Sequence, residues 1–254
     1  MSHRLSAGGY RIESKESRAE RRLLWESHCH ARFEMIAVLE GDVEICPEGR
    51  RYRLTAGQAL FVPPLVYHTV ASRTEGGVYR RVTALFPADA VPDAIRARFE
   101  ARAAEMPVFS LPVAARLAAL CGREDAAPCA PLAEALMTEA LYACLEAEAH
   151  TERDAVDERL REALAYVDAH LGGDVSIARI AGALACSPSA ISHLFTARLG
   201  TSPKQYILQK RMALAEREIA LGTPPTLVAE RLGYANYSSF YRIYKKHFQR
   251  SPRG

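Results

Sequence analysis

Residues 176–199 read SIARIAGALACSPSAISHLFTARL, and residues 223–248 read TPPTLVAERLGYANYSSFYRIYKKHF. In each stretch a short apolar helix is followed by a tight break and then by a second helix. In the first stretch, Ser176 and Ser187 are placed to cap the two helices, and Pro188 suits a first helical turn. Two short helices with a brief turn form a helix-turn-helix, whose second helix can enter the major groove of DNA.

The second stretch repeats this layout. Thr223 with Pro224 is predicted to cap and start its first helix, Gly233 to end that helix, and Asn236 to cap the second helix. Between the two units the sequence predicts a helix over 203–220, about 27 Å long at 1.5 Å per residue. That length would place the two recognition helices about one DNA turn apart, roughly 34 Å, so that both enter successive major grooves.

Apolar residues at helical spacing leave one side of each second helix polar. The predicted DNA-contacting residues are Ser189, Ser192, His193, Tyr237, Ser238, Tyr241, Arg242 and Lys245. Arg242 is the strongest candidate, because a guanidinium can bond O6 and N7 of guanine together. For each of these residues the alternative is a solvated surface position.

Charge supports a polyanionic partner for the C-terminal part. Residues 157–254 hold fourteen Lys and Arg against eight Asp and Glu, whereas the whole chain balances at +3. Basic side chains that neutralise phosphates release condensed counterions, which favours binding to DNA.

Residues 158–254 resemble the DNA-binding domain of the AraC/XylS family of bacterial regulators. The resemblance is carried by Gly233-Tyr234, Ser238-Ser239-Phe240, Arg242, Tyr244-Lys245-Lys246, Phe248 and Ser251-Pro252, together with Leu194-Phe195, Leu199-Gly200 and Ser202-Pro203. It implies that the base-reading positions are those of the outward residues named above. It also implies double-stranded DNA, a homodimer, RNA polymerase and a small-molecule effector as partners.

The N-terminal part reads as strands. Stretches 33–39, 51–54, 59–62 and 78–86 are short and rich in branched and aromatic residues, and turn clusters separate them. This spacing predicts a sandwich or barrel over residues 1–90. The expected fold is thus two domains: an N-terminal β-barrel with accessory helices, and a C-terminal all-α domain of two helix-turn-helix units joined by a long helix.

Residues 91–150 are predicted to form accessory helices, and residues 151–157 a linker. The clearest helix covers 132–147, where Leu132, Leu136 and Leu141 recur at helical spacing. This leucine stripe could pack against the barrel or form a dimer seam, and the sequence does not decide between them.

A second group of candidate site residues lies in the predicted barrel. On an extended strand, His28, His30 and Glu34 share one face because side chains alternate with a period of two. His68 could meet them from another strand. Three imidazoles and a carboxylate suit a divalent transition metal such as Zn, Mn, Fe, Ni or Cu.

The spacing from His28 to Glu34, with Gly41, Gly57, Pro63 and His68, resembles the two motifs of the cupin fold, although Leu65 stands where a glycine is usual. The resemblance implies a metal site, and a metal-free effector pocket built from the same residues is the alternative. Cys29 is a further but weaker candidate ligand, because its side chain would point away from the histidines.

Composition limits the class of protein. A chain of 254 residues with 49% apolar and 25% charged residues is expected to form two globular domains. Neither a membrane span nor a secretory signal is recognised, so a cytoplasmic protein with no membrane partner is expected, nucleoid-associated when bound to DNA, with its cysteines as thiols.

Three function classes remain. The first is a transcriptional regulator controlled by a metal or small molecule, which uses both halves of the chain. A cupin enzyme would have no use for two helix-turn-helix units, so no catalytic residues are assigned. A constitutive DNA-binding protein with an inert barrel is the third.

Overall fold

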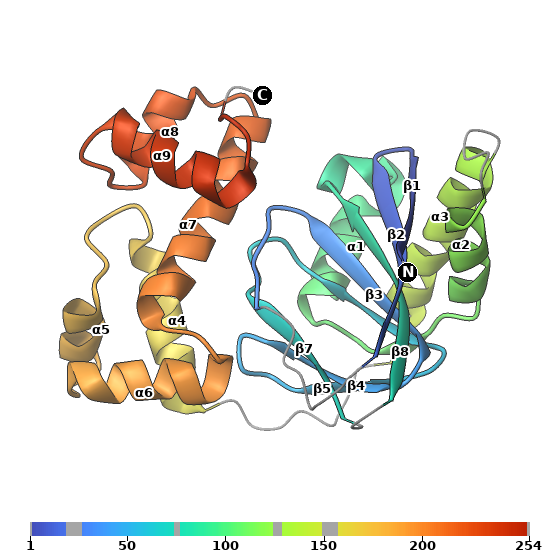
Figure 1. The fold of residues 1–254 in the computed structure, drawn as a ribbon, viewed down its shortest axis with the longest axis horizontal. Coiled ribbons are helices and arrows are strands. Elements are labelled where there is room, and N and C mark those ends of the chain that lie inside the picture. Colours follow the sequence, from blue (N-terminus) through green and yellow to red (C-terminus); the bar gives the residue numbers. More distant parts are fainter. Residues whose placement is uncertain (1, 19–26, 74–76, 124–128, 149–156, 253–254) are drawn as a thin grey trace.

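The computed structural model describes residues 2–18, 27–73, 77–123, 129–148 and 157–252. A β-rich N-terminal part and a helical C-terminal part lie side by side (Figure 1). Of the linker predicted at 151–157, only Asp157 belongs to the described residues.

Two antiparallel sheets form the N-terminal part, which we call the β-sandwich. The larger sheet has the strand order β1-β2-β8-β3-β6-β9 and the smaller the order β5-β4-β7. The strands are β1 (Ser2–Ala7), β2 (Tyr10–Arg18), β3 (Phe33–Glu40), β4 (Asp42–Pro47), β5 (Tyr52–Thr55), β6 (Gln58–Val62), β7 (His68–Ser72), β8 (Val78–Phe86) and β9 (Phe109–Ser110). The cupin-like β-fold is confirmed, but its two sheets do not join into one closed barrel.

The central strand β3 is buried on both faces. Its sequence FEMIAVLE alternates between two cores: Phe33 and Met35 pack beneath the helices, whereas Ile36 and Val38 pack between the sheets. Glu34 shares the face of Ile36, and its carboxylate therefore enters the space between the two sheets.

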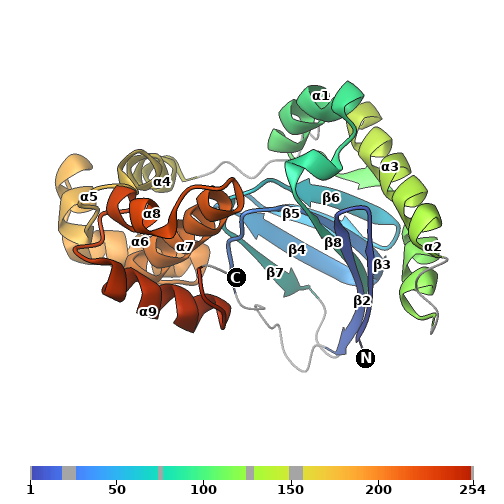
Figure 2. The same ribbon diagram turned by 90° about the horizontal axis from the view of Figure 1, so that it is seen from above.

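Three helices cover the outer face of the larger sheet (Figure 2). They are α1 (Asp93–Ala104), α2 (Ala114–Cys121) and α3 (Ala130–Glu146), and a short 3-10 turn, η1 (Ala88–Ala90), precedes them. Leu136 and Leu141 of the predicted leucine stripe are buried in this core, while Leu132 stays exposed. The stripe thus packs largely against its own sheet, which is the first of the two alternatives.

The C-terminal part contains α4 (Glu158–His170), α5 (Ile177–Ala183), α6 (Pro188–Leu199), α7 (Pro203–Ala220), α8 (Pro225–Arg231) and α9 (Tyr237–Phe248). The pairs α5-α6 and α8-α9 are the two predicted helix-turn-helix units. Helix α7 has the predicted bounds and contributes to both helical cores, through Tyr206 and Ile207 to one and through Met212 and Ala215 to the other.

Among the described residues, no single helix is long and apolar enough to cross a membrane. The pair α5 and α6, bent by 100°, meets the test of length and composition only when both helices are taken together.

Candidate effector site and DNA-binding surface

His28, His30, Glu34 and His68 come together between the two sheets. One ligand atom from each lies within 4.8 Å of the others. The Nε2 atoms of His68, His30 and His28 lie 2.9, 3.0 and 3.7 Å from the same oxygen, Oε2 of Glu34. Ligands bound at about 2.0–2.2 Å to one ion lie about 3–3.6 Å apart in octahedral or tetrahedral geometry. The predicted cluster is therefore formed, with spacings that suit a metal ion.

The backbone that carries the cluster differs from the expected single strand. Residues 31–32 form a bend, so β3 begins only at Phe33. His28 instead pairs with His68 through two backbone hydrogen bonds of 3.0 and 3.1 Å, which bring the two rings to a centroid distance of 4.4 Å. Backbone pairing with His68 of β7 therefore places His28 next to the other candidate ligands, the position that was expected from a continuous strand.

The opposite ring nitrogens fix which nitrogen can bind a cation. Nδ1 of His30 lies 2.9 Å from the carbonyl oxygen of Arg32, and Nδ1 of His68 lies 3.0 Å from that of Val66. A carbonyl oxygen only accepts hydrogen bonds, so both Nδ1 atoms carry the hydrogen. Nε2 of each ring then faces the oxygen of Glu34, to which it donates a hydrogen bond when the ring is protonated, and beside which its lone pair can bind a cation when the ring is neutral.

The electrostatics of the cluster favour an ionised Glu34 and the neutral form of His68. Burial raises the pKa of Glu34, but hydrogen bonds from His28, His30 and His68 outweigh it and hold that pKa well below its usual value. Burial lowers the pKa of His68. Neutral imidazoles and an ionised carboxylate are the forms that ligate metals.

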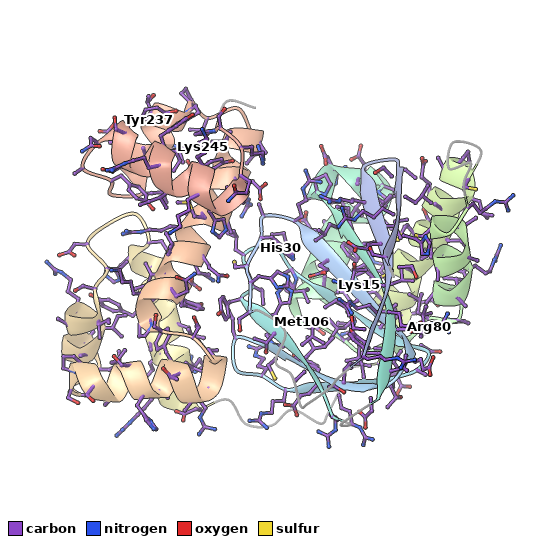
Figure 3. The ribbon with its side chains drawn as sticks, in the orientation of Figure 1. Lys15, His30, Arg80, Met106, Tyr237 and Lys245 are labelled. Carbon is purple, nitrogen blue, oxygen red and sulfur yellow. The ribbon has the colours of Figure 1, made fainter. Side chains whose placement is uncertain are left out.

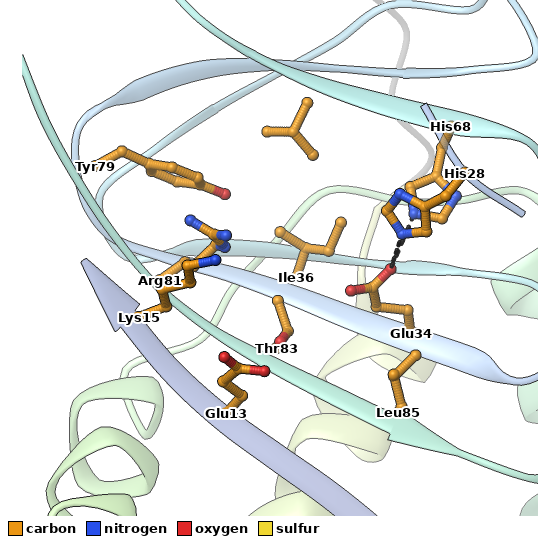
Figure 4. Close-up of a pocket in the computed structure, with 11 residues that line it drawn as sticks. Glu13, Lys15, His28, Glu34, Ile36, His68, Tyr79, Arg81, Thr83 and Leu85 are labelled. Atoms are coloured by element: carbon orange, nitrogen blue, oxygen red, sulfur yellow. Dashed lines mark hydrogen bonds and ion pairs between the residues drawn. The ribbon is translucent and has the colours of Figure 1, made fainter. Parts of the chain in front are cut away.

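A pocket of about 460 Å³ opens beside the cluster. Figure 4 shows His28, Glu34 and His68 at one end, and Lys15, Arg81 and Tyr79 at the other. This volume falls in the range of small-molecule sites. This second end was not predicted from the sequence, although residues 79, 81, 83 and 85 of the predicted strand 78–86 share one face by their period of two.

Cys29 takes no part in the cluster. Its side chain is buried in the core that contains Tyr206, and burial raises the pKa of its thiol to about 12.

Three of the four helices in the helix-turn-helix units begin with the capping residue that the sequence predicts. Oxygens of Ser176, Ser187 and Asn236 accept hydrogen bonds from the backbone nitrogens of Arg179, Ala190 and Ser239, respectively. The prediction for Thr223 is wrong, because α8 begins at Pro225 with Pro224 as its N-cap residue and no side-chain cap. A residue before proline avoids the helical conformation, so Pro225 keeps Pro224 extended and delays the helix by one residue.

The predicted DNA-contacting residues lie on the surfaces of α6 and α9. Ser189, His193, Ser238, Arg242 and Lys245 are exposed, and Ser192, Tyr237 and Tyr241 are half-buried. Figure 3 labels Tyr237 and Lys245 on α9. The hydroxyl of Ser192 already donates to the carbonyl of Pro188, at 3.0 Å.

Comparison with known proteins identifies both halves. Residues 12–141 match the model of the AraC-like ligand binding domain, and residues 180–254 match that of a helix-turn-helix domain. The chain belongs to the AraC family of transcriptional regulators. It is a regulator with a DNA-binding helix-turn-helix domain and an N-terminal ligand-binding domain.

Relatives of this AraC-type regulator differ in how much of it they match. An uncharacterized HTH-type transcriptional regulator of Bacillus subtilis, YobQ, is 26% identical over 235 residues, which cover 91% of this chain and 88% of YobQ. The arabinose operon regulatory protein of Escherichia coli is 32% identical over 127 residues, 48% of this chain and 42% of that protein. The structure of ToxT from Vibrio cholerae is 11% identical, with a TM-score of 0.42, and the match covers 96% of this chain and 97% of ToxT.

In this regulator, an ion-pair network around the buried Lys210 joins α7 to the β-sandwich. Nζ of Lys210 lies 3.0 Å from Oε1 of Glu48 and 2.8 Å from Oδ1 of Asp168, and donates to the carbonyl of Leu65 at 2.8 Å. Burial lowers the pKa of Lys210, but the two carboxylates outweigh it and raise that pKa above its usual value. The sequence signal for this residue was a lysine on the apolar side of helix 203–220, next to Tyr206 and Ala213.

The segments that hold the histidines touch the same helix. The carbonyl of Ser27 accepts a hydrogen bond from Nε2 of Gln209 at 3.1 Å, and the amide of Leu65 donates to the carbonyl of His30 at 2.8 Å. The ring of Tyr67, next to His68, packs on Tyr206 with centroids 5.0 Å apart. The segments that carry the candidate metal ligands therefore lie at the interface with α7.

Proposed function

We propose that this regulator binds a divalent transition metal through His28, His30, Glu34 and His68, and that the occupancy of the pocket sets its affinity for DNA. The observation that carries the proposal is the convergence of three Nε2 atoms on one buried carboxylate oxygen. Zn, Mn, Fe, Ni and Cu all accept this donor set. No catalytic role is proposed for it.

The interface with α7 offers a route from the pocket to DNA. A ligand shifts a conformational equilibrium only by binding one state better than the other. A metal drawing His28 and His68 together acts on the segments 27–30 and 65–68, which hydrogen-bond to Gln209 and Lys210 of α7. Because α7 carries both helix-turn-helix units, a change there reaches both.

The first test is the metal content of tag-free protein purified without chelator, measured by mass spectrometry. We expect about one metal ion per chain, and its loss in His30→Ala and His68→Ala, because each variant removes one of four ligands. His193→Ala, in the DNA-binding half, is the matched control and keeps the metal. Metal-free protein that folds and binds DNA would leave a metal-free effector pocket in place of the metal site.

We further propose that Ser189, Ser192, His193, Tyr237, Ser238, Tyr241, Arg242 and Lys245 contact DNA. Arg242→Ala is expected to cost about 1–3 kcal/mol at one base pair and to relax specificity there. Binding to the operator and to random DNA is compared by titration at fixed salt. Equal losses on both would make Arg242 a phosphate contact.

We propose that the regulator works in the cytoplasm as a homodimer that contacts RNA polymerase and is nucleoid-associated when bound to DNA. The exposed Leu132 and Tyr142 on α3, 42% and 46% accessible, are apolar surface available for the dimer. Monomeric sedimentation at micromolar concentration, with and without DNA, would contradict it.

A further inference from the structure

The end of the pocket opposite the histidines places two cations face to face. Lys15 of β2 and Arg81 of β8 are direct cross-strand partners, and both line the pocket. Like charges directly opposite each other destabilise a sheet. On the other face of the same strand pair the register joins Arg80 to Glu16, an ordinary ion pair at 3.9 Å. The like-charge pair is therefore specific to the pocket face.

One acid, Glu13, lies on the same face, two residues before Lys15. It forms an ion pair with Arg4 at 3.4 Å, accepts a hydrogen bond from Ser2 and also interacts electrostatically with Lys15, so one carboxylate is shared among several cations and this end keeps a positive balance. Figure 4 shows the amine of Lys15 and the guanidinium of Arg81 close together across the pocket from Glu34. The cationic end thus suits an anionic group of a ligand.

The rest of the pocket lining is mainly apolar. It consists of Ile36, Val70 and Leu85 with the hydroxyl of Thr83, and Figure 4 shows Ile36 and Thr83 between the cationic end and Glu34. With a divalent ion bound, the ion and the two cations outweigh Glu13 and Glu34 by two positive charges. A dianion with a short hydrocarbon body matches both the charge and the lining.

We infer that the effector is an organic dicarboxylic acid, with one carboxylate held by Lys15 and Arg81 and the other directed at the metal cluster. This inference rests on the proposed function, because it names the class of ligand for the same pocket. The cation pair fits a carboxylate, since charge-assisted hydrogen bonds from Arg and Lys are the strong ones.

The probes are the dicarboxylates from oxalate to adipate, titrated by calorimetry into full-length protein loaded with zinc, beside the matching neutral diamides. At least one dicarboxylate is expected to bind with a Kd below about 1 mM, and its diamide at least about tenfold more weakly. Lys15→Gln and Arg81→Gln should each weaken that binding about tenfold and leave the zinc content unchanged.

Arg80→Gln is the matched control, because it removes the same charge from the neighbouring residue on the opposite face. Absence of saturable binding by the whole series, equal binding of the diamide, or an equal loss in Arg80→Gln would overturn the inference. If zinc still binds and still changes DNA affinity, the proposed function survives that failure. The protein could also take up no metal and still bind a dicarboxylate through Lys15 and Arg81. That result would support the anion site and overturn the proposed metal site.

Discussion

Leu65 has a backbone conformation that most side chains avoid, with φ at +65°. A left-handed residue other than glycine costs about 1–3 kcal/mol and persists only where its surroundings hold it. Here the amide of Leu65 bonds to His30 and its carbonyl accepts from Lys210. The strained residue is thus the one that connects a metal-ligand segment to α7.

The pKa directions in the histidine cluster predict sensitivity to acid. The pKa of Glu34 lies well below its ordinary 4.5, and that of His68 lies below its ordinary 6.5. In both cases the unfolded chain takes up protons at a higher pH than the folded chain, so this contribution to stability is present above pH 6.5 and is lost as the pH falls.

We therefore expect the free energy of unfolding of metal-free protein to fall between pH 7 and pH 4.5, measured by urea denaturation. His68→Gln should flatten the upper part of this profile, because it removes the buried imidazole. A variant profile as steep as that of the parent would show that other groups cause the loss.

At the scale of helices and strands, local signals decide where a helix starts. Asn236 caps α9 through Oδ1 and the amide of Ser239 at 2.9 Å, whereas Thr223 precedes two prolines and caps no helix. Asn236→Ala should lower the free energy of unfolding by about 1 kcal/mol, and Thr223→Ala by less than about 0.5 kcal/mol. Chemical denaturation of both variants measures this, and equal losses would contradict the assigned caps.

The same contrast explains what the sequence could predict. The start of α7 follows from Ser202 and Pro203, which are neighbours in the chain. The pairing of Lys15 with Arg81 depends on the register of two strands far apart in sequence, and such register is not a local property. The histidine cluster was predictable from spacing, but the bend at 31–32 and the pairing of His28 with His68 depend on tertiary contacts.

At the scale of the whole molecule, Lys210 is one of the residues that join the two halves, beside Tyr206 and Gln209. Its side chain is 5% exposed and joins Glu48 of the β-sandwich to Asp168 of α4. Lys210→Met should lower the free energy of unfolding by about 1–3 kcal/mol, less than for a fully buried pair because both acids are partly exposed.

The same variant should also reduce the change in DNA affinity that metal produces, measured by titration with and without zinc. Lys204→Met, at the exposed start of α7, is the matched control and should change neither quantity. An unaltered zinc response in Lys210→Met would place the coupling elsewhere in the interface.

Helix α7 contacts the β-sandwich near Lys210, and its C-terminal end packs against α8 and α9. Among the described residues, the core that α7 forms with α8 and α9 has no member from the β-sandwich. A cavity of about 640 Å³ separates that C-terminal end from the sandwich, with Arg32 and Arg96 on one side and Glu216 and Tyr244 on the other. A small rotation of α7 about Lys210 would therefore displace α9 more than it displaces the residues next to Lys210. The cavity leaves space for this movement, and neither recognition helix would have to change its shape.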